Sequence, residues 1–263
     1  MRPEQKQKLA GFLDLAGDYL RDGYVRPREP CSFTDDPGSG QGSDRGSGAA
    51  APLSGGPSFS RPREGADTGA DTLEGIAAEI GVCRSCPLGA GRTNAVPGEG
   101  AEHPLVLVVG EGPGQDEDRT GRPFVGPAGQ LLDKMLASIG LGRETNCFIV
   151  NVVKCRPPGN RDPEAEELLA CAPYLERQIR CLKPRALLCV GRISANSLLG
   201  NVERQSIRNL RGRFVDYFVQ GMGAVPLIAT YHPSALLRNE EWKRPAWEDL
   251  KMLRAKIDEI KGT

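Results

Sequence analysis

A loop rich in both glycine and acid is the first candidate for chemistry in this chain. It spans residues 110–118, reads GEGPGQDED and follows an apolar run at 105–109. Glycine loops at strand ends commonly hold phosphate, but the carboxylates of Glu111 and Glu117 would repel that ligand. The third glycine comes too early for a dinucleotide fingerprint, and no Gly-Lys-Ser or Gly-Lys-Thr follows. The glycines therefore favour a flat ligand that the main chain can approach closely. The carboxylates would lie beside a water molecule or a positively charged transition state, such as that of glycosidic bond cleavage.

Three side chains outside this loop are candidates for contacts with such a ligand. Phe124, in TGRPFVG, is either a core aromatic or a plate that stacks on a base. Asn151 opens NVVKC, and its amide either caps a turn or reads the donor and acceptor edge of a uracil. His232 is either structural or donates a hydrogen bond to an oxygen that gathers negative charge.

The segment after His232 predicts contacts with a nucleic acid. It reads PSALLRN, and it offers Leu236 or Leu237 as a wedge into a duplex and Arg238 as a phosphate ligand. A basic stretch supports this reading, at Arg204, Arg208, Arg211 and Arg213. The alternative is that these residues form an ordinary solvated surface.

The cysteines predict a metal centre. Cys83 and Cys86 form a C-x-x-C turn, whereas Cys155 and Cys171 stand alone further along the chain. A cubane iron-sulfur cluster takes one thiolate per iron and suits this pattern; structural zinc and unliganded core cysteines are the alternatives. Three other cysteines lie in apolar patterns and are expected to be small buried residues: Cys147, Cys181 and Cys189.

Composition sets broad limits on the protein. The 263 residues include 34 Lys and Arg and 34 Asp and Glu, so net charge neither indicates nor excludes a nucleic-acid partner. No run of about 18 apolar residues is present, and the first residues, MRPEQKQK, lack the apolar core of a signal peptide. We expect a cytoplasmic protein that does not enter a membrane, acting close to the nucleoid.

Strand-like and helix-like runs alternate from about Thr72 onwards. The expected strands are 105–110, 147–153, 186–191 and 226–231, with a weaker edge strand at 213–219. The expected helices are 131–139, 163–182, 194–199 and 245–260. This alternation predicts an α/β fold with three α/β/α layers around a central, mostly parallel four-stranded sheet. Ligands of such folds bind at the carboxyl ends of the strands, where the polar motifs lie.

The chain divides into three predicted regions. Residues 1–25 carry apolar residues at helical spacing and predict an amphipathic N-terminal helix. Residues 26–71 are rich in Gly, Ser and Pro and predict a flexible, disordered linker. Residues 72–263 are expected to form the catalytic domain. An apolar helix on a flexible linker suggests that the first helix binds a protein partner.

Taken together, the motifs resemble the uracil-DNA glycosylases of family 4, the iron-sulfur branch of that superfamily. The resemblance covers about 72–260 and rests on GEGPGQDED, TGRPFVGPAG, NVVKCRPPGNR and HPSALLRN in this order, with the four cysteines at family-like spacing. It implies a three-layer α/β/α domain that flips uracil out of single- or double-stranded DNA. The implied reaction is hydrolysis of the N-glycosidic bond, which releases uracil and leaves an abasic site for base excision repair.

The resemblance also implies roles for residues of the pocket. Phe124 would stack on uracil, Asn151 would pair with its edge, and His232 would stabilise O2 of the departing anion. Glu117 matches a family position near C5 of the base, where it would exclude the methyl group of thymine. Gly112 and Gln115 would contact the substrate. In the best-known branch an aspartate orients the water at the position of Gly112, which leaves two candidates for that role here, Glu111 and Glu117.

The remaining implications concern the DNA surface and the metal. Ser234, Leu236 and Arg238 would contact DNA. A structural 4Fe-4S cluster would be held by Cys83, Cys86, Cys155 and Cys171. One relative with the same cluster captures uracil covalently through a histidine in an extra basic loop, and residues 201–213 contain no histidine. We therefore expect turnover, and we expect a monomer.

Overall fold

The computed structural model describes residues 71–200 and 205–262 of the chain. The predicted helix over 1–25 lies outside these ranges, as does all of the predicted linker except Asp71. Arg204, from the basic stretch, also lies outside them. Both predictions about the N-terminal region therefore stay predictions.

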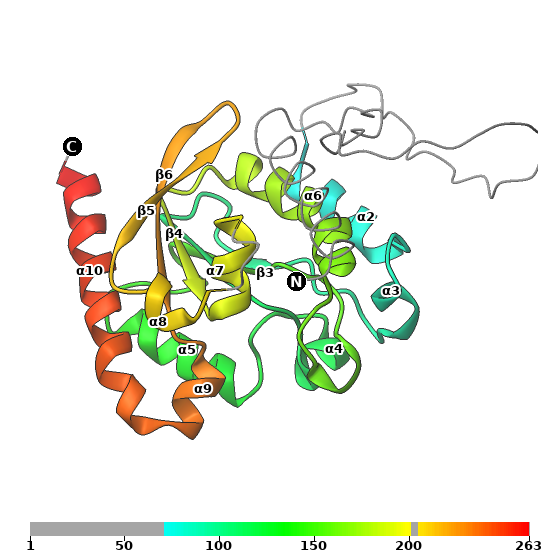
Figure 1. Cartoon of the computed structure of the whole chain (residues 1–263). Helices are drawn as coiled ribbons and strands as arrows, with labels where there is room; N and C mark the ends of the chain where they lie inside the picture. The colour runs from blue at the N-terminus through cyan, green and yellow to red at the C-terminus, as the bar shows by residue number, and fades with distance from the viewer. Residues whose placement is uncertain (1–70, 201–204, 263) are drawn as a thin grey trace, which may run out of the picture. The chain divides into compact units, whose positions relative to one another are not determined.

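A six-stranded mixed sheet, mostly parallel, forms the centre of the described domain (Figure 1). Its strand order is β1-β3-β2-β4-β6-β5. The four inner strands are parallel: β2 (Val106–Gly110), β3 (Cys147–Asn151), β4 (Ala186–Val190) and β6 (Gly223–Thr230). In β2, β3 and β4 every residue is buried, because helices cover both faces of these strands.

The predicted sheet had four strands, whereas the observed sheet has two more, one at each edge. The candidate edge strand exists as β5 (Phe214–Val219), which pairs antiparallel with β6. At the opposite edge, β1 (Glu99–Gly100) pairs antiparallel with β3. A strand of two residues has no apolar pattern, so it could not be predicted. The paired carbonyls of β3 leave no room for a side chain at Gly100, whose φ is 149°.

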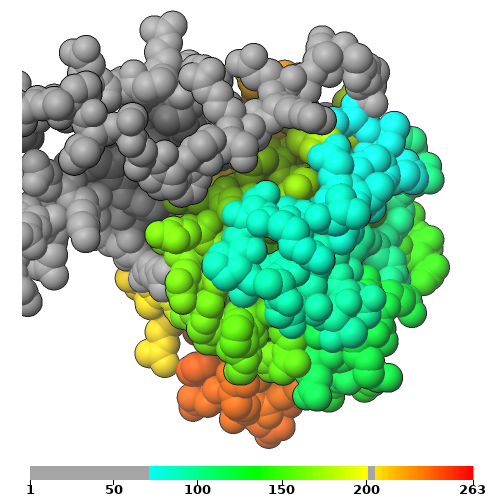
Figure 2. Space-filling view, turned by 90° about the vertical axis from the view of Figure 1, so that its right-hand side faces the viewer, coloured from blue at the N-terminus to red at the C-terminus, as the bar shows by residue number. Residues whose placement is uncertain are grey.

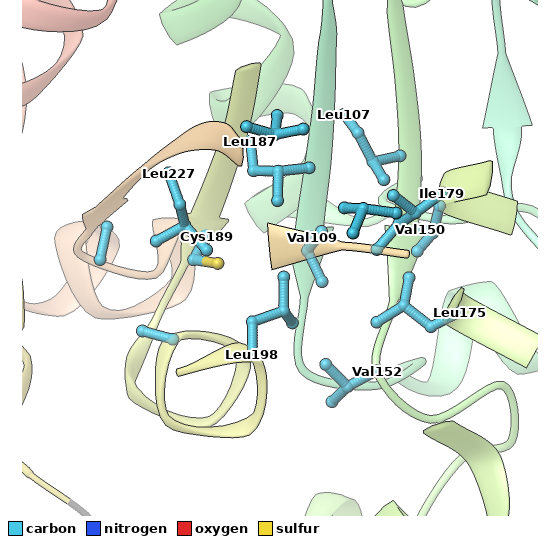
Figure 3. Packing of buried hydrophobic residues seen from close by; sticks show 14 of the residues in the cluster. Leu107, Val109, Val150, Val152, Leu175, Ile179, Leu187, Cys189, Leu198 and Leu227 are labelled. Carbon is cyan, nitrogen blue, oxygen red and sulfur yellow. The ribbon is translucent and has the colours of Figure 1, made fainter. Parts of the chain in front are cut away.

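Helices pack on both faces of the sheet. On one face, Leu107, Val109 and their neighbours pack against α6 (Ala165–Leu182), α7 (Arg192–Leu198) and α8 (Ile207–Leu210), as Figure 3 shows in part. On the other face, Val106 and Val108 pack against α5 (Pro127–Ala137) and α10 (Lys243–Gly262). Alternate residues of one strand thus serve two separate cores.

Short helical segments carry the motifs beyond the carboxyl ends of the strands: α4 (Gln115–Thr120), α9 (Pro233–Arg238) and the 3-10 turns Pro158–Asn160 and Glu240–Trp242. Two further helices, α2 (Leu73–Val82) and α3 (Leu88–Gly91), flank the C-x-x-C turn. The acidic stretch at 110–118 was predicted as a loop, and its second half forms α4; the segment after His232 forms α9. Among the described residues, no helix is both long and apolar enough to cross a membrane.

Candidate active site

One cavity of about 430 Å³ opens at the carboxyl ends of the inner strands. It is lined by segments that are far apart in the sequence, including α4 and α9, whose surfaces appear green and orange in Figure 2. The structure brings nine of the predicted residues to this cavity: Glu111, Gly112, Gln115, Glu117, Phe124, Asn151, His232, Ser234 and Arg238.

Phe124 is held in a strained backbone conformation. Its φ is 52°, which is uncommon for a residue with a side chain. Arg143 fixes it by donating to the carbonyls of Pro123 and Phe124, both at 3.0 Å. A side chain at Gly129 would collide with the Phe124 backbone, and one at Gly110 would collide with its ring. These close approaches explain both glycines, and they present a fixed aromatic plate to the cavity.

Asn151 lies at the last position of β3, with 1% of its surface exposed. Its Oδ1 is buried and has no hydrogen-bond partner among the described residues. A side chain at Gly110 would also meet this oxygen, so the amide packs directly against β2. A buried amide oxygen without a partner is costly, which marks it as a group that awaits a donor from a ligand.

His232 caps the N-terminus of α9 and faces Phe124. Its Nδ1 accepts a hydrogen bond from the main-chain N–H of Ser234 at 3.2 Å and lies 2.8 Å from Ser234 Oγ. The two rings have centroids 5.7 Å apart. Burial lowers the pKa of His232 to about 4, with Arg238 acting in the same direction and Glu117 opposing it. The imidazole is therefore neutral at pH 7, and because Nδ1 is an acceptor, Nε2 carries the proton and can donate it.

Glu117 binds main-chain amides of the pocket wall. One oxygen accepts from Val125 N and Gly126 N at 2.9 and 3.0 Å, and the other accepts from Gly114 N at 3.0 Å. The carboxylate thus joins the glycine loop to the segment that follows Phe124. A carboxylate with three amide donors is well suited to hold the loop, and it has less freedom to bind a water.

The carboxyl of Glu111 has a perturbed acidity. Burial raises the pKa of its carboxyl to about 7, the charge of Asp162 adds to this and Arg192 opposes it. Asp162 and Arg192 themselves form an ion pair at 2.5 Å beside the cavity. A carboxylate whose pKa lies near neutrality suits a group that accepts a proton from water.

Gly112 cannot be replaced by an acidic residue without a rearrangement. A Cβ at this position would lie 2.8 Å from Val153 Cγ2. The structure therefore leaves no room at this position for the aspartate of the best-known branch.

The DNA-facing predictions need one correction. Leu236 is only 2% exposed and packs with Tyr231 and Ala246, so the prediction that it contacts DNA is wrong. The neighbouring Leu237 is 50% exposed, because consecutive residues of a helix point in different directions. Arg238 is exposed and lines the cavity, and its contact with phosphate stays a prediction.

Arg211, from the predicted basic stretch, is held by the protein itself. It pairs with Asp249 at 2.8 Å and lies over the ring of Tyr231. Arg208 and Arg213 are exposed.

The four predicted metal ligands line a second, smaller cavity. Cys83 follows α2, Cys86 precedes α3, Cys155 follows β3 and Cys171 lies within α6. Two cations reach the same cavity: Arg92 donates to the sulfur of Cys155 at 3.0 Å, and Lys154 is also part of the lining. In the described part of the chain, no three His, Cys, Asp or Glu side chains form a ready site for a single metal ion.

The other cysteines divide in an unexpected way. Cys147 and Cys189 are fully buried in strands, as expected. Cys181 is only partly buried, and its thiol contacts the carbonyl of Asp71 at 3.2 Å, so its prediction as a buried residue is wrong.

Sequence analysis missed two residues that bear on the site. Asn160 lines the cavity with a positive φ of 54°, and its Oδ1 accepts from Arg156 at 2.7 Å. Lys154 is fully buried, and burial lowers its pKa to about 8 while the sulfurs of Cys171 and Cys155 oppose the shift. A lysine inside the apolar run NVVKC was the available signal for the second residue.

Comparison with known proteins agrees with this geometry. Residues 97–251 match the family model of the uracil DNA glycosylase superfamily. The type-4 uracil-DNA glycosylase of Saccharolobus solfataricus is 43% identical over 152 residues, which cover 57% of this chain and 69% of that protein. That of Pyrobaculum aerophilum is 46% identical over 149 residues, covering 56% and 75%. A type-5 uracil-DNA glycosylase of the same organism is 34% identical over 145 residues, covering 50% and 62%. The chain therefore belongs to the uracil-DNA glycosylase superfamily, in its type-4 group.

Proposed function

We propose that this chain removes uracil from DNA by hydrolysing the N-glycosidic bond, as the first step of base excision repair. The enzyme class follows from membership of the type-4 group. The roles of individual residues are our proposal, and they rest on the geometry of the cavity. Because the substrate is DNA, we place the activity in the cytoplasm, close to the nucleoid.

The observation that carries this proposal is the buried amide of Asn151. Its Oδ1 has no partner among the described residues, and it shares a cavity with Phe124 and His232. Uracil presents an N3–H donor beside an O4 acceptor, so one amide satisfies both, with Oδ1 accepting and Nδ2 donating. A base that leaves Oδ1 without a donor is penalised by the cost of a buried unpaired group.

The remaining residues fit the electronic demands of the reaction. As the C1′–N1 bond breaks, its electron pair moves onto uracil and negative charge collects at O2. The neutral imidazole of His232 donates from Nε2 to that oxygen. Water adds its oxygen to C1′ of the positively charged sugar, and Glu111 accepts the proton that the water loses. Phe124 stacks on the flipped base, and Glu117 holds the wall near C5, where it would exclude a methyl group.

DNA binding is assigned to the rim of the same cavity. Arg238 and Ser234 line it and are placed to meet phosphate, and the exposed Leu237 takes the place of Leu236 as the wedge between bases. The described part of the basic segment, residues 205–213, contains no histidine that could capture uracil. We therefore propose turnover of single- or double-stranded substrate by a monomer.

A structural 4Fe-4S cluster is the cofactor that the cysteine cavity fits. Four thiols converge on it from separate elements, one for each iron of a cubane cluster. The two cations that reach the cavity also fit, because four thiolates give such a cluster a net negative charge. Cys83, Cys86, Cys155 and Cys171 would hold it, and it would tie α2, α3 and α6 to the end of β3.

The decisive experiment measures release of free uracil from an oligonucleotide by the purified full chain, with iron and protein determined on the same sample. We expect the wild-type protein to be brown and to release uracil. We expect the variant Asn151→Ala to lose most of this activity. The matched control is Asn209→Ala, an amide outside the cavity on α8. No release of uracil by iron-loaded wild-type protein would overturn the proposal.

A further inference from the structure

Lys154 is a buried cation that belongs to both sites. It is only 1% exposed and lines the cysteine cavity, while its Nζ donates to the main-chain carbonyl of Asn151 at 2.7 Å. The side chain thus turns back from the end of the segment that holds Cys155 to the residue that faces the base. A buried ammonium is costly unless it has acceptors and a nearby negative charge.

The groups that could supply negative charge beside Lys154 are sulfurs. Cys155 and Cys171 line the same cavity as Lys154, and each becomes a thiolate when it binds a metal. Within 71–200 and 205–262, no carboxylate forms an ion pair with this lysine. A cluster bound by the four cysteines would supply the charge that compensates the ammonium.

The rest of the turn leaves Asn151 dependent on this lysine. Val152 N and Val153 N donate to the carbonyls of Gly110 and Glu111 at 3.0 and 3.2 Å, so the turn follows the acidic loop. The carbonyl of Asn151 faces the other way, towards Lys154. Because this carbonyl is attached to Cα of Asn151, its position helps to fix the direction of the Cα–Cβ bond. The direction of the side-chain amide follows from that bond.

We propose that Lys154 is a positioning residue that couples the cysteine-bound cluster to uracil recognition, by balancing the thiolate charge and fixing the main chain of Asn151. This inference rests on the proposed function, because it takes both the cluster and the role of Asn151 from it. It assigns the cluster an effect on the base pocket through one side chain, in addition to tying elements of the fold together.

The test compares Lys154→Met with wild type as cluster-loaded full chains. We expect KM for a single-stranded uracil oligonucleotide to rise about tenfold or more, since a buried carbonyl loses a charged donor. We expect kcat per cluster to change less than about threefold, because His232 and Glu111 are untouched. Loss of a nearby cation should also shift the reduction potential of the cluster to a more negative value.

Two further variants separate positioning from general support of the fold. In an Asn151→Ala background, Lys154→Met should raise KM no further, because a residue that acts through Asn151 is not additive with it. Arg177→Met is the control: Arg177 is a cation that binds the carboxylates of Asp71 and Glu79, and it lines neither cavity. It should leave KM and the potential unchanged.

The outcomes distinguish this inference from the proposed function. If wild type releases uracil while Lys154→Met keeps its KM and its potential, or if its effect adds fully to that of Asn151→Ala, the inference is wrong and the function stands. If iron-loaded wild type releases no uracil, the function itself fails. If Lys154→Met does not retain a cluster, the same comparison is made with Lys154→Gln, which removes the positive charge, and Lys154→Arg, which keeps it. Only Lys154→Gln should lower the reduction potential of the cluster. Equal potentials in these two variants would overturn the inference.

Discussion

The base cavity and the cysteine cavity lie at the two ends of segment 151–155 and are built by different means. Around the base cavity the chain holds its own parts: Glu117 binds amides of two loops, and Arg143 fixes the backbone of Phe124. Around the cysteine cavity, Arg84 and Arg92 likewise donate to main-chain carbonyls near Cys83, but the cavity itself is lined by four thiols from the α2–α3 turn, the end of β3 and α6. The difference teaches that the base cavity is closed by contacts of the polypeptide alone, whereas the cysteine cavity gathers metal-binding groups that a bound cluster would join.

The largest effect is expected where the cohesion of the cysteine cavity is removed. Cys155→Ser should lose most of the iron and several kcal/mol of unfolding free energy, because cluster binding contributes to folding. Cys189→Ala is the control, since this buried cysteine of β4 is outside the cavity; it should cost about 1 kcal/mol and no iron. Iron analysis and chemical denaturation measure both. Equal iron loss in the two variants would contradict the comparison.

The base cavity should lose rate while its fold survives. His232→Ala removes the donor that we assign to O2 of uracil, so single-turnover release should slow about 100- to 1000-fold. Ser234→Ala, which removes only the hydroxyl beside Nδ1, should slow release less. The melting temperatures of the two variants should be similar. A His232→Ala enzyme within about threefold of wild type would remove the histidine from the mechanism.

Because of Glu111, the rate of uracil release should increase with pH. A carboxylate must be ionised to accept a proton, so release should rise through an apparent pKa of about 7. In Glu111→Gln this limb should vanish, and the rate at pH 8 should fall about 100-fold. His232 should add no limb near pH 6.5, because burial holds its pKa at about 4.

The same carboxyl should also make stability depend on pH. Its folded pKa is about 7, above the value of 4.5 expected when unfolded, so between these values the folded protein keeps a proton that the unfolded chain releases. Stability is therefore full below pH 4.5 and falls by about 3 kcal/mol as pH rises to 7. Denaturation of Glu111→Gln across this range should lack that contribution. An unchanged slope would show that Glu111 ionises normally.

The smallest effect tests how firmly the chain holds the base cavity. Glu117→Gln replaces a carboxylate that accepts three amide bonds with an amide that has one acceptor oxygen, which should cost about 1–3 kcal/mol of unfolding free energy. Asp116 forms an ion pair with the exposed Arg119 at 3.6 Å, and Asp116→Asn should cost less than about 0.5 kcal/mol. Equal losses would show that the loop is not held by Glu117.

The inner strands could be predicted because burial on both faces leaves continuous apolar runs such as 105–109. The edge strand β1 could not, because two paired residues leave no pattern. The meeting of Asn151 and His232 followed from their places after β3 and β6, since parallel strands end at one edge of the sheet. Phe124 joins them from the segment between α4 and α5.

The errors concern directions and partners that a linear pattern does not specify. Leu236 and Leu237 are alike in sequence, and only the packing of α9 against α5 and Ala246 decides which is buried. The amide partners of Glu117 leave one trace, the spacing from Gly114 that forms a capping box. Whether Lys154 is buried depends on cysteines from other elements, which the local sequence does not reveal.

The hydrogen bonds between Asn196 and Gln205 have a practical consequence for engineering. The Asn196 amide donates to the Gln205 carbonyl and accepts from the Gln205 N–H, both at 2.9 Å, and it also donates to the Arg192 carbonyl. The main chain of Gln205 is thus fixed to α7 through one side chain. Asn196→Ala would release the donor and the acceptor of Gln205 together, so a redesign of α7 should keep this amide.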